Sequence, residues 1–415
     1  MLILILSACN HDSPYSSTDE KIALPIIRIE TVDSAPILDR ENWVTMTFSL
    51  EDPNNESNNI SAISNQQIRG RGNSSWTQVP PDGKKPYRIR FRDTEQQGLM
   101  GLPPARNWVL MSYGQILNDT IAFELGRRLG LVCTPSFHHV ELYLNDDYRG
   151  IYLLTEHRQA DPNEIGAPGR PRVDFTEGWF VEIDRYYDED PKFRTPTEYN
   201  FGAQIGLPIM VKTPEVSSND INDPIFDNVK NDWNNLMELM SSTTFPDNGW
   251  RDLVDIDSFA KYFMIQTIML NIDVFRVRVE EGRKIGSTYY YRRDNNSKIK
   301  AGPLWDLSWS LTDTTHDGRR FTPDSFQYPI VPFWRRFFDD PVFLARYKEI
   351  WNENYQSNIR TMLTFIDKIA SNVESSDIRN NERWNSVQNF NVSVSNWKNF
   401  YNSRIIFLNT VYNLE

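Results

Sequence analysis

Cysteine and zinc-binding patterns are nearly absent from this chain. Its 415 residues include two cysteines, Cys9 and Cys133, and five histidines. If Cys9 carries a lipid, as its surroundings suggest below, Cys133 has no partner and no disulfide framework can form. The histidines neither follow an H-x-x-x-H pattern nor combine with cysteine pairs at zinc spacing. We therefore expect neither a disulfide-stabilised scaffold nor a zinc site.

Long apolar runs and an excess of basic residues are also missing. No stretch approaches the roughly 20 apolar residues that a bilayer-spanning helix needs. The 56 acidic residues outnumber the 44 lysines and arginines, which gives a net charge of -12. That charge would repel a nucleic-acid backbone, and no basic run with interleaved aromatics offsets it. We therefore expect no membrane span and no nucleic-acid partner.

The N-terminus nevertheless carries a membrane signal of another kind. Residues 2–6 are apolar, and Leu6-Ser7-Ala8-Cys9 resembles a bacterial lipobox, whose cysteine becomes the lipidated first residue. The apolar stretch is shorter than the roughly 7 to 15 residues of a secretory signal and lacks a basic start, so a frayed cytosolic terminus is the alternative. The lipobox pattern predicts a lipid anchor on Cys9, a polar tether over residues 10–21 and a place in the cell envelope.

The segment 255–311 holds a helix and a hairpin between two acids. Apolar residues recur with helical spacing, so a helix is expected over 257–271. Two strand-like runs, 288–292 and 298–301, flank the turn signal Asp-Asn-Asn-Ser at 294–297. The hairpin therefore returns the chain to the end from which it started.

This geometry brings Asp306, which follows the hairpin, close to Asp273, which follows the helix. A protein kinase has the same order of elements: a helix, an acid in a loop, a hairpin and a second acid. There the first acid orients the acceptor hydroxyl and the second holds Mg²⁺. The protein-kinase motifs His-Arg-Asp and Asp-Phe-Gly are absent. A lone aspartate after a helix is usually a cap or turn residue, whereas Asp306 lies between aromatic residues, where a buried acid must be paired or bound to metal.

A second motif lies in the N-terminal half, at residues 67–76 (QIRGRGNSSW). Gly70 and Gly72 flank Arg71 there, and a glycine turn lets backbone N–H groups approach phosphate oxygens. A tight turn beside solvated arginines is the alternative interpretation. The strand expected next, over 84–92, puts Lys85, Tyr87, Ile89 and Phe91 on one face and Arg88, Arg90 and Arg92 on the other.

A helix is expected over 116–130, ending at Gly130. Glu124 borders its apolar stripe, where a kinase helix presents a glutamate to the phosphate-contacting lysine. An i, i+4 ion pair with Arg128 explains Glu124 equally well. The sequence leaves both interpretations open.

The chain is long enough for two lobes. With 39% hydrophobic and 13% aromatic residues it can bury a large core. Short apolar runs predict β structure in the first half, whereas helical periodicity dominates the second, at 226–241, 341–355, 359–373 and 394–412. We predict an α+β, bilobal fold with a nucleotide cleft between the lobes. The expected divisions are a signal and tether at 1–22, a β-rich N-terminal lobe at 23–216, and a helical C-terminal lobe with the acid-bearing hairpin at 217–415.

Several of these segments together resemble the spore coat protein H (CotH) family of atypical kinases. The resemblance covers about residues 24–310. It is carried by RGRGNSSW (69–76), KKPYRIRF (84–91), ELYLNDDYRGIYLLTEH (141–157), KTPE (212–215), LNID (270–273), GSTYYY (286–291) and GPLWDLSWS (302–310).

The resemblance implies a bilobal kinase-like fold that transfers a phosphoryl group from Mg-ATP to a protein hydroxyl. In that interpretation Asp306 binds Mg²⁺ and Asp273 is the essential loop acid. The expected nucleotide-binding residues are Gly70, Arg71, Gly72, Lys85 as the phosphate-contacting lysine, Arg88, and Glu124 as the partner of Lys85.

The chain departs from the kinase and family patterns at two places. Protein kinases carry an asparagine soon after the loop acid, but none lies between Asp273 and the hairpin. Ser287 or Thr288 would have to substitute, or a single metal ion would bind. Ser308 stands where many relatives have a second acid, which predicts weaker metal binding.

Two other functions are compatible with the sequence. A lipoprotein that is exported across the inner membrane has little ATP available, and a fold can be retained after its catalytic activity is lost. The second hypothesis is therefore a catalytically weak or inactive, surface-anchored binding protein whose aromatic cleft recognises a glycan or a protein. The third is a metal-dependent hydrolase that uses Asp273 and Asp306. Nucleotide binding separates the first hypothesis from the second, and phosphate appearing in a protein rather than in water separates the first from the third.

Overall fold

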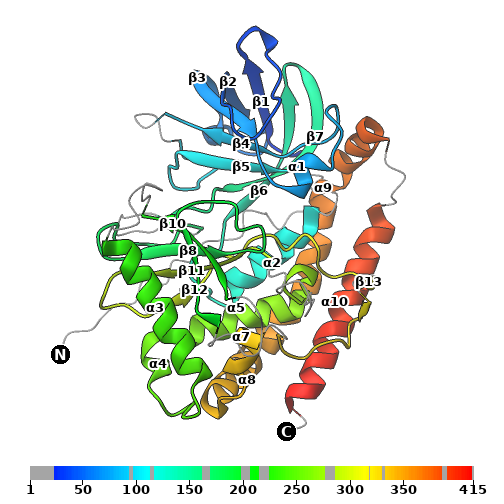
Figure 1. Ribbon diagram of the computed structural model, residues 1–415. Coiled ribbons are helices and arrows are strands. Elements are labelled where there is room, and N and C mark those ends of the chain that lie inside the picture. Colours follow the sequence, from blue (N-terminus) through cyan, green and yellow to red (C-terminus); the bar gives the residue numbers. More distant parts are fainter. Residues whose placement is uncertain are drawn as a thin grey trace, which may run out of the picture.

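The computed structural model confirms a mixed α+β fold, with a β-rich region over residues 26–213 and helices dominating the rest (Figure 1). The expected lipobox with Cys9 and the polar tether lie outside the described residues. Those residues are 23–92, 97–112, 116–160, 169–197, 206–214, 224–275, 286–316, 318–329, 332–385 and 390–413.

The N-terminal strands form a closed barrel, in the upper part of Figure 1. Burial alternates along β1 and β2, and the inward side chains form a separate hydrophobic core that includes Ile27, Phe48, Ile68, Ile89 and Trp108. A parallel pairing of β1 with β6 closes the barrel. Its strands, in spatial order, are β1 (Ile26–Thr31), β2 (Val44–Glu51), β3 (Ile60–Gly70), β4 (Tyr87–Arg90), β5 (Asn107–Met111), β7 (Asp147–Glu156) and β6 (Phe137–Leu144).

A second sheet joins strands from both halves of the sequence. Strand β8 pairs on one side with β10 and on the other with the first strand of the predicted hairpin, β11. The strands at 179–183, 192–194 and 208–213, expected in the N-terminal lobe, therefore share a sheet with the acid-bearing hairpin. The order of this sheet is β12 (Lys300–Ala301), β11 (Thr288–Arg292), β8 (Trp179–Ile183), β10 (Pro208–Thr213) and β9 (Lys192–Arg194).

Helix α5 (Ile256–Met269) runs through the larger core. It begins at Asp255, whose side chain accepts a hydrogen bond from the Ser258 N–H (2.9 Å). It is buried on nearly all sides, not along one stripe, because α2, α8, α10 and β12 all pack against it. The other described helices of this body include α2 (Ile116–Arg128), α3 (Pro224–Ser241), α4 (Trp250–Leu253), α7 (Pro332–Phe337), α8 (Pro341–Asn354), α9 (Met362–Trp384) and α10 (Phe390–Asn413). No described helix is both long and apolar enough to cross a membrane.

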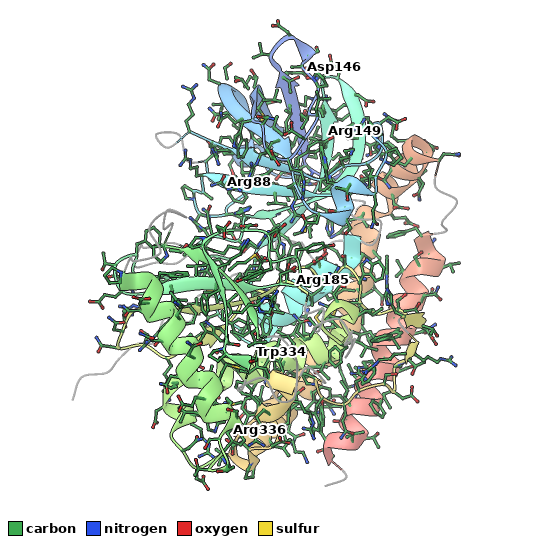
Figure 2. All side chains as sticks on the ribbon, viewed as in Figure 1. Arg88, Asp146, Arg149, Arg185, Trp334 and Arg336 are labelled. Carbon is green, nitrogen blue, oxygen red and sulfur yellow. The ribbon has the colours of Figure 1, made fainter. Side chains whose placement is uncertain are left out.

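Helix α9 extends well beyond residue 373, where the sequence pattern predicted its end. Its last turns are polar because they contact the barrel, not the helical core. Asn380 accepts a hydrogen bond from Lys84 Nζ (2.6 Å), and the Trp384 indole donates to the Arg149 carbonyl (3.1 Å). Arg149 lies where the barrel meets this helix (Figure 2). The helix therefore ties the two cores together.

Glu156, at the end of β7, allows a test of the barrel's electrostatics. Its side chain is 1% exposed, and burial raises its pKa from 4.5 to about 7 although Arg170 opposes the shift. The folded state thus binds more protons than the unfolded state between these pH values, so stability falls as pH rises through them. Glu156→Gln keeps an acceptor for the Gly169 N–H and removes the loss of stability that accompanies rising pH. Relative to wild type, the variant should gain up to about 3 kcal/mol between pH 4.5 and 8, measured by thermal unfolding.

The matched control is Glu177→Gln, because Glu177 lies on the exposed surface. The Glu177→Gln variant should unfold at nearly the wild-type temperature, because substitutions on the exposed surface have small effects on stability. A Glu156→Gln difference that stays constant from pH 4.5 to 8 would contradict the assigned burial of this carboxyl group.

Candidate active site

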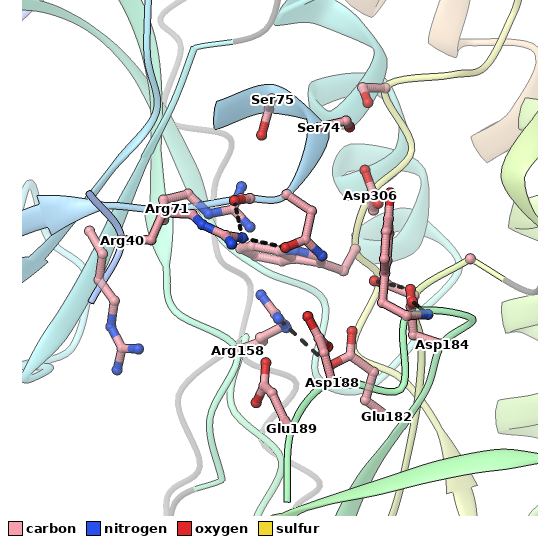
Figure 3. A pocket seen from close by; sticks show the side chains of 18 of the residues that line it. Arg40, Arg71, Ser74, Ser75, Arg158, Glu182, Asp184, Asp188, Glu189 and Asp306 are labelled. Atoms are coloured by element: carbon pink, nitrogen blue, oxygen red, sulfur yellow. Dashed lines mark hydrogen bonds and ion pairs between the residues drawn. The ribbon is translucent and has the colours of Figure 1, made fainter. Parts of the chain in front are cut away.

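A cleft between the barrel and the helical body brings most of the predicted site residues together (Figure 3). Its volume is about 680 Å³. The barrel side comes from β3, β4 and the short helix α1 (Ser74–Thr77), and the opposite side from the end of β8, the short helix α6 (Ile272–Phe275) and the loop after β12. Of the predicted residues, the lining includes Gly70, Arg71, Gly72, Arg88, Asp273 and Asp306.

Asp273 and Asp306 converge, as the order of helix and hairpin predicts. Asn271, which the sequence analysis did not single out, joins the two segments that carry them. Its Nδ2 donates to the Asp306 carbonyl (3.2 Å), and its Oδ1 accepts from the Asp273 N–H (3.2 Å). Two backbone bonds, Ile272 N–H to the Trp309 carbonyl and Leu311 N–H to the Met269 carbonyl, strengthen the same junction. The relative position of the two acids is therefore fixed by the backbone and by one buried amide.

The electrostatics of the two acids favour a cation. Burial raises the pKa of Asp306 to about 6, and the charge of Asp273 adds to the shift, although Arg71, Arg158 and Arg185 oppose it. Asp273 itself accepts a hydrogen bond from Arg185 Nη1 (3.1 Å). A cation between the carboxylates would stabilise the charged form of Asp306, because it would offset both burial and repulsion.

Arginines from the barrel side of the cleft face these acids. Arg71 and Arg158, both labelled in Figure 3, lie on the same side of the site. Their guanidinium carbons are 5.7 and 5.4 Å from the ring centroid of Trp305, the residue before Asp306. Burial lowers the pKa of Arg88 to about 9, and the neighbouring Arg69, Arg90 and Arg158 contribute to the shift. An anion placed among such crowded guanidinium groups is stabilised, and guanidinium groups bind phosphate well.

The glycine turn works differently from the expectation. The Gly70 N–H donates to the Asp39 carbonyl (2.9 Å) and the Arg71 N–H to the Pro86 carbonyl (3.2 Å), so the protein itself uses these two amides. Gly70 packs so closely on Trp76 that a Cβ atom would lie 2.5 Å from the indole ring. Gly72 has a φ of +85°, which favours glycine. The turn therefore presents the Arg71 side chain, and not the amides of residues 70 and 71, to the cleft.

Lys85 does not line the cleft. Its Nζ donates to the Trp76 carbonyl (3.0 Å) and lies 4.2 Å from the centroid of that indole. Strand β4 begins at Tyr87, and Lys85 shares the buried side with Tyr87 and Ile89, whereas Arg88 lies on the cleft side. The position of Lys85 therefore does not support the expected contact with phosphate.

The predicted pairing of Glu124 with Lys85 does not form. The Glu124 carboxylate instead pairs with Arg127 and Arg128 of its own helix, each at 2.7 Å. The i, i+4 alternative from the sequence is the one found. Glu124 is 2% exposed, so these two guanidinium groups compensate a buried charge.

Ser287 and Thr288, the proposed substitutes for the missing asparagine, have different partners, and Ser308 stands in place of the second acid. Ser287 and Ser308 both line the cleft. The Ser287 hydroxyl donates to Asp184 Oδ2 (3.0 Å), whereas the Thr288 hydroxyl donates to the Ile183 carbonyl (3.3 Å). Asp184, directly after β8, is a cleft carboxylate that the sequence analysis missed. Only its position at the end of a fully buried strand could have indicated it.

The donor set fits a Mg²⁺ ion that arrives with a nucleotide. Within the described ranges, no group of three or more His, Cys, Asp or Glu side chains gathers to hold a metal ion. Mg²⁺ commonly takes one or two carboxylates and completes its shell with phosphate oxygens and water. Asp306, with Asp273 close enough to influence its pKa and arginines nearby for phosphate, meets that requirement.

A two-core α+β molecule with acids facing arginines across a cleft has the architecture expected of a kinase. The chain belongs to the CotH kinase protein family, because the sequence model of that family matches residues 68–408. It is also similar to the crystal structure of the proinflammatory kinase CtkA from Helicobacter pylori, at 11% identity and a TM-score of 0.29, over 80% of this chain and 95% of that one. No curated protein matches the chain.

Proposed function

We propose that this protein transfers a phosphoryl group from Mg-ATP to a hydroxyl group of a protein. One observation carries the proposal. Asp273 and Asp306 converge at one side of a cleft whose other side presents Arg71 and Arg88. Family membership supports the same chemistry.

Each cleft residue has a separate role in this reaction. Asp306 would bind Mg²⁺, which when bound neutralises charge on the phosphates. Asp273 orients the acceptor hydroxyl and accepts its proton, and the Arg185 guanidinium at 3.1 Å holds the Asp273 carboxylate in place. Arg71, Arg88 and Arg158 bind phosphate oxygens. Lys85 and Glu124, which have other partners, take no part.

Nucleotide binding to the purified wild-type protein tests this proposal. At 100 times its dissociation constant, a ligand that binds only the folded state stabilises it by about 2.7 kcal/mol. Mg-ATP should therefore raise the melting temperature, and ATP with EDTA should raise it less, because phosphates would then face the carboxylates without a cation. If no combination of nucleotide and divalent metal shifts the melting of the folded protein, the inactive binding scaffold becomes the better account.

We also propose that Cys9 carries a lipid and anchors the protein in the cell envelope. The sequence Leu6-Ser7-Ala8-Cys9 supports this. Because acyl anchoring depends on buried methylene groups, Cys9→Ala should move the protein from the membrane to the soluble fraction of fractionated cells. Cys133→Ala is the matched control and should leave the distribution unchanged. Equal solubility of wild type and Cys9→Ala would contradict the anchor.

A further inference from the structure

The first turns of α2 contact the loop that carries Asp306. Asn118 Nδ2 donates to the carbonyls of Ser308 (2.8 Å) and Ser310 (3.0 Å). The Leu307 N–H donates to Asp119 Oδ1 (2.9 Å). Asn118 and Asp119 are both 0% exposed. Three buried hydrogen bonds therefore connect two adjacent residues of one helix to the five residues that begin at Asp306.

The backbone at Asp306 needs such support. Its φ is +58°, in the left-handed region, which is strained for a non-glycine residue and persists only when its surroundings hold it. On one side Asn271 binds the Asp306 carbonyl. On the other side Asp119 binds the N–H of the next residue, Leu307. Both contacts hold the same peptide group, the one between Asp306 and Leu307, which limits rotation of the backbone at Asp306 and hence the direction of its carboxylate.

Resting on the proposed kinase function, we infer that Asn118 and Asp119 are positioning residues that set the metal affinity of Asp306. They do not line the cleft. Their effect passes through the loop backbone, as with the outer-sphere partners of other metal ligands. Helix α2 packs against α5, α9 and β7, elements of both cores, so the direction of Asp306 depends on how the barrel sits on the helical body.

Asn118→Leu tests the inference, because leucine has the same branching and the same number of side-chain heavy atoms but no donor. We expect the affinity for Mn²⁺ in the presence of a non-hydrolysable ATP analogue to fall about tenfold or more, measured by electron paramagnetic resonance. The affinity for the analogue in EDTA should stay within about twofold, because the arginines are untouched. Asn118→Ser should also weaken Mn²⁺ binding, because the serine hydroxyl is too short to reach both carbonyls. This variant serves as the test if the leucine variant does not fold.

Thr120→Val is the matched control. Thr120 lies on the same helix, is also 0% exposed, and its hydroxyl forms a hydrogen bond with Nε2 of His139 on the barrel strand β6 (3.1 Å). It should lose comparable thermal stability and bind Mn²⁺ as the wild type does. Normal Mn²⁺ affinity in both Asn118 variants, or an equal loss in Thr120→Val, would overturn the inference. A wild-type protein that binds no Mn²⁺ with the analogue would overturn both the inference and the proposed function.

Discussion

Replacing Asp306 with asparagine is expected to abolish the Mg²⁺-dependent part of nucleotide binding. Asparagine keeps the shape of the side chain but supplies no negative charge to a hard cation. The side chain lies in a buried site where its charge is already costly, because burial and Asp273 both raise its pKa. Arg71, Arg158 and Arg185 offset that cost only in part and a bound cation would offset the rest, so removing the carboxylate should also remove the metal.

The rate of phosphoryl transfer in Asp306→Asn should also fall, because the metal ion is lost. A metal ion supplies several kcal/mol of charge stabilisation in the transition state, which corresponds to a loss on the order of 10³-fold. Asp313→Asn is the control, because Asp313 is an exposed acid outside the cleft. A Mg-ATP melting shift that survives in Asp306→Asn would keep the nucleotide site and remove Asp306 as its metal ligand.

Replacing Asp273 with asparagine is expected to separate binding from chemistry. Asparagine still offers Arg185 an acceptor oxygen, and the backbone contacts of Asp273 with Asn271 and Gly286 do not depend on its side chain. Mg-ATP affinity should therefore change little. Orienting the acceptor hydroxyl and taking up its proton acts at the chemical step, so transfer should fall by about 10² to 10⁴-fold.

The measurements are the melting shift and the initial rate of transfer on the same preparation. A large fall in rate with a nearly unchanged shift is the expected pair of results. If Asp273→Asn transfers phosphate at the wild-type rate, the proton acceptor lies elsewhere. Asp184, the other buried carboxylate named in the cleft, is then the next residue to replace.

The convergence of the two acids was predictable because it rests on local signals. Helical periodicity fixes α5, and the turn residues 294–297 fix a hairpin whose ends lie together. Those two elements are enough to bring Asp306 to Asp273. Asn271 was not predictable from the same signals, since its two hydrogen bonds require the finished junction.

Contacts between distant segments account for most of the remaining errors. Strand alternation correctly divides residues 84–92 into two faces, but it does not say which face points to the cleft. Lys85 lies on the face that points away from the cleft. The bond from Asn118 to Ser308 spans 190 residues, and no periodicity encodes such a distance. Arg158 likewise gains its place in the cleft only when β7 and the second sheet meet.

The central claim is that the cleft transfers phosphate to a protein. The most direct measurement incubates the purified wild-type protein with γ-labelled ATP and Mg²⁺, with casein as a generic hydroxyl-bearing acceptor, and follows label in protein and in released phosphate. The account predicts label in the protein itself or in casein, and no label above background with Asp273→Asn. Label found only as free phosphate, with an equal rate in Asp273→Asn, would contradict it.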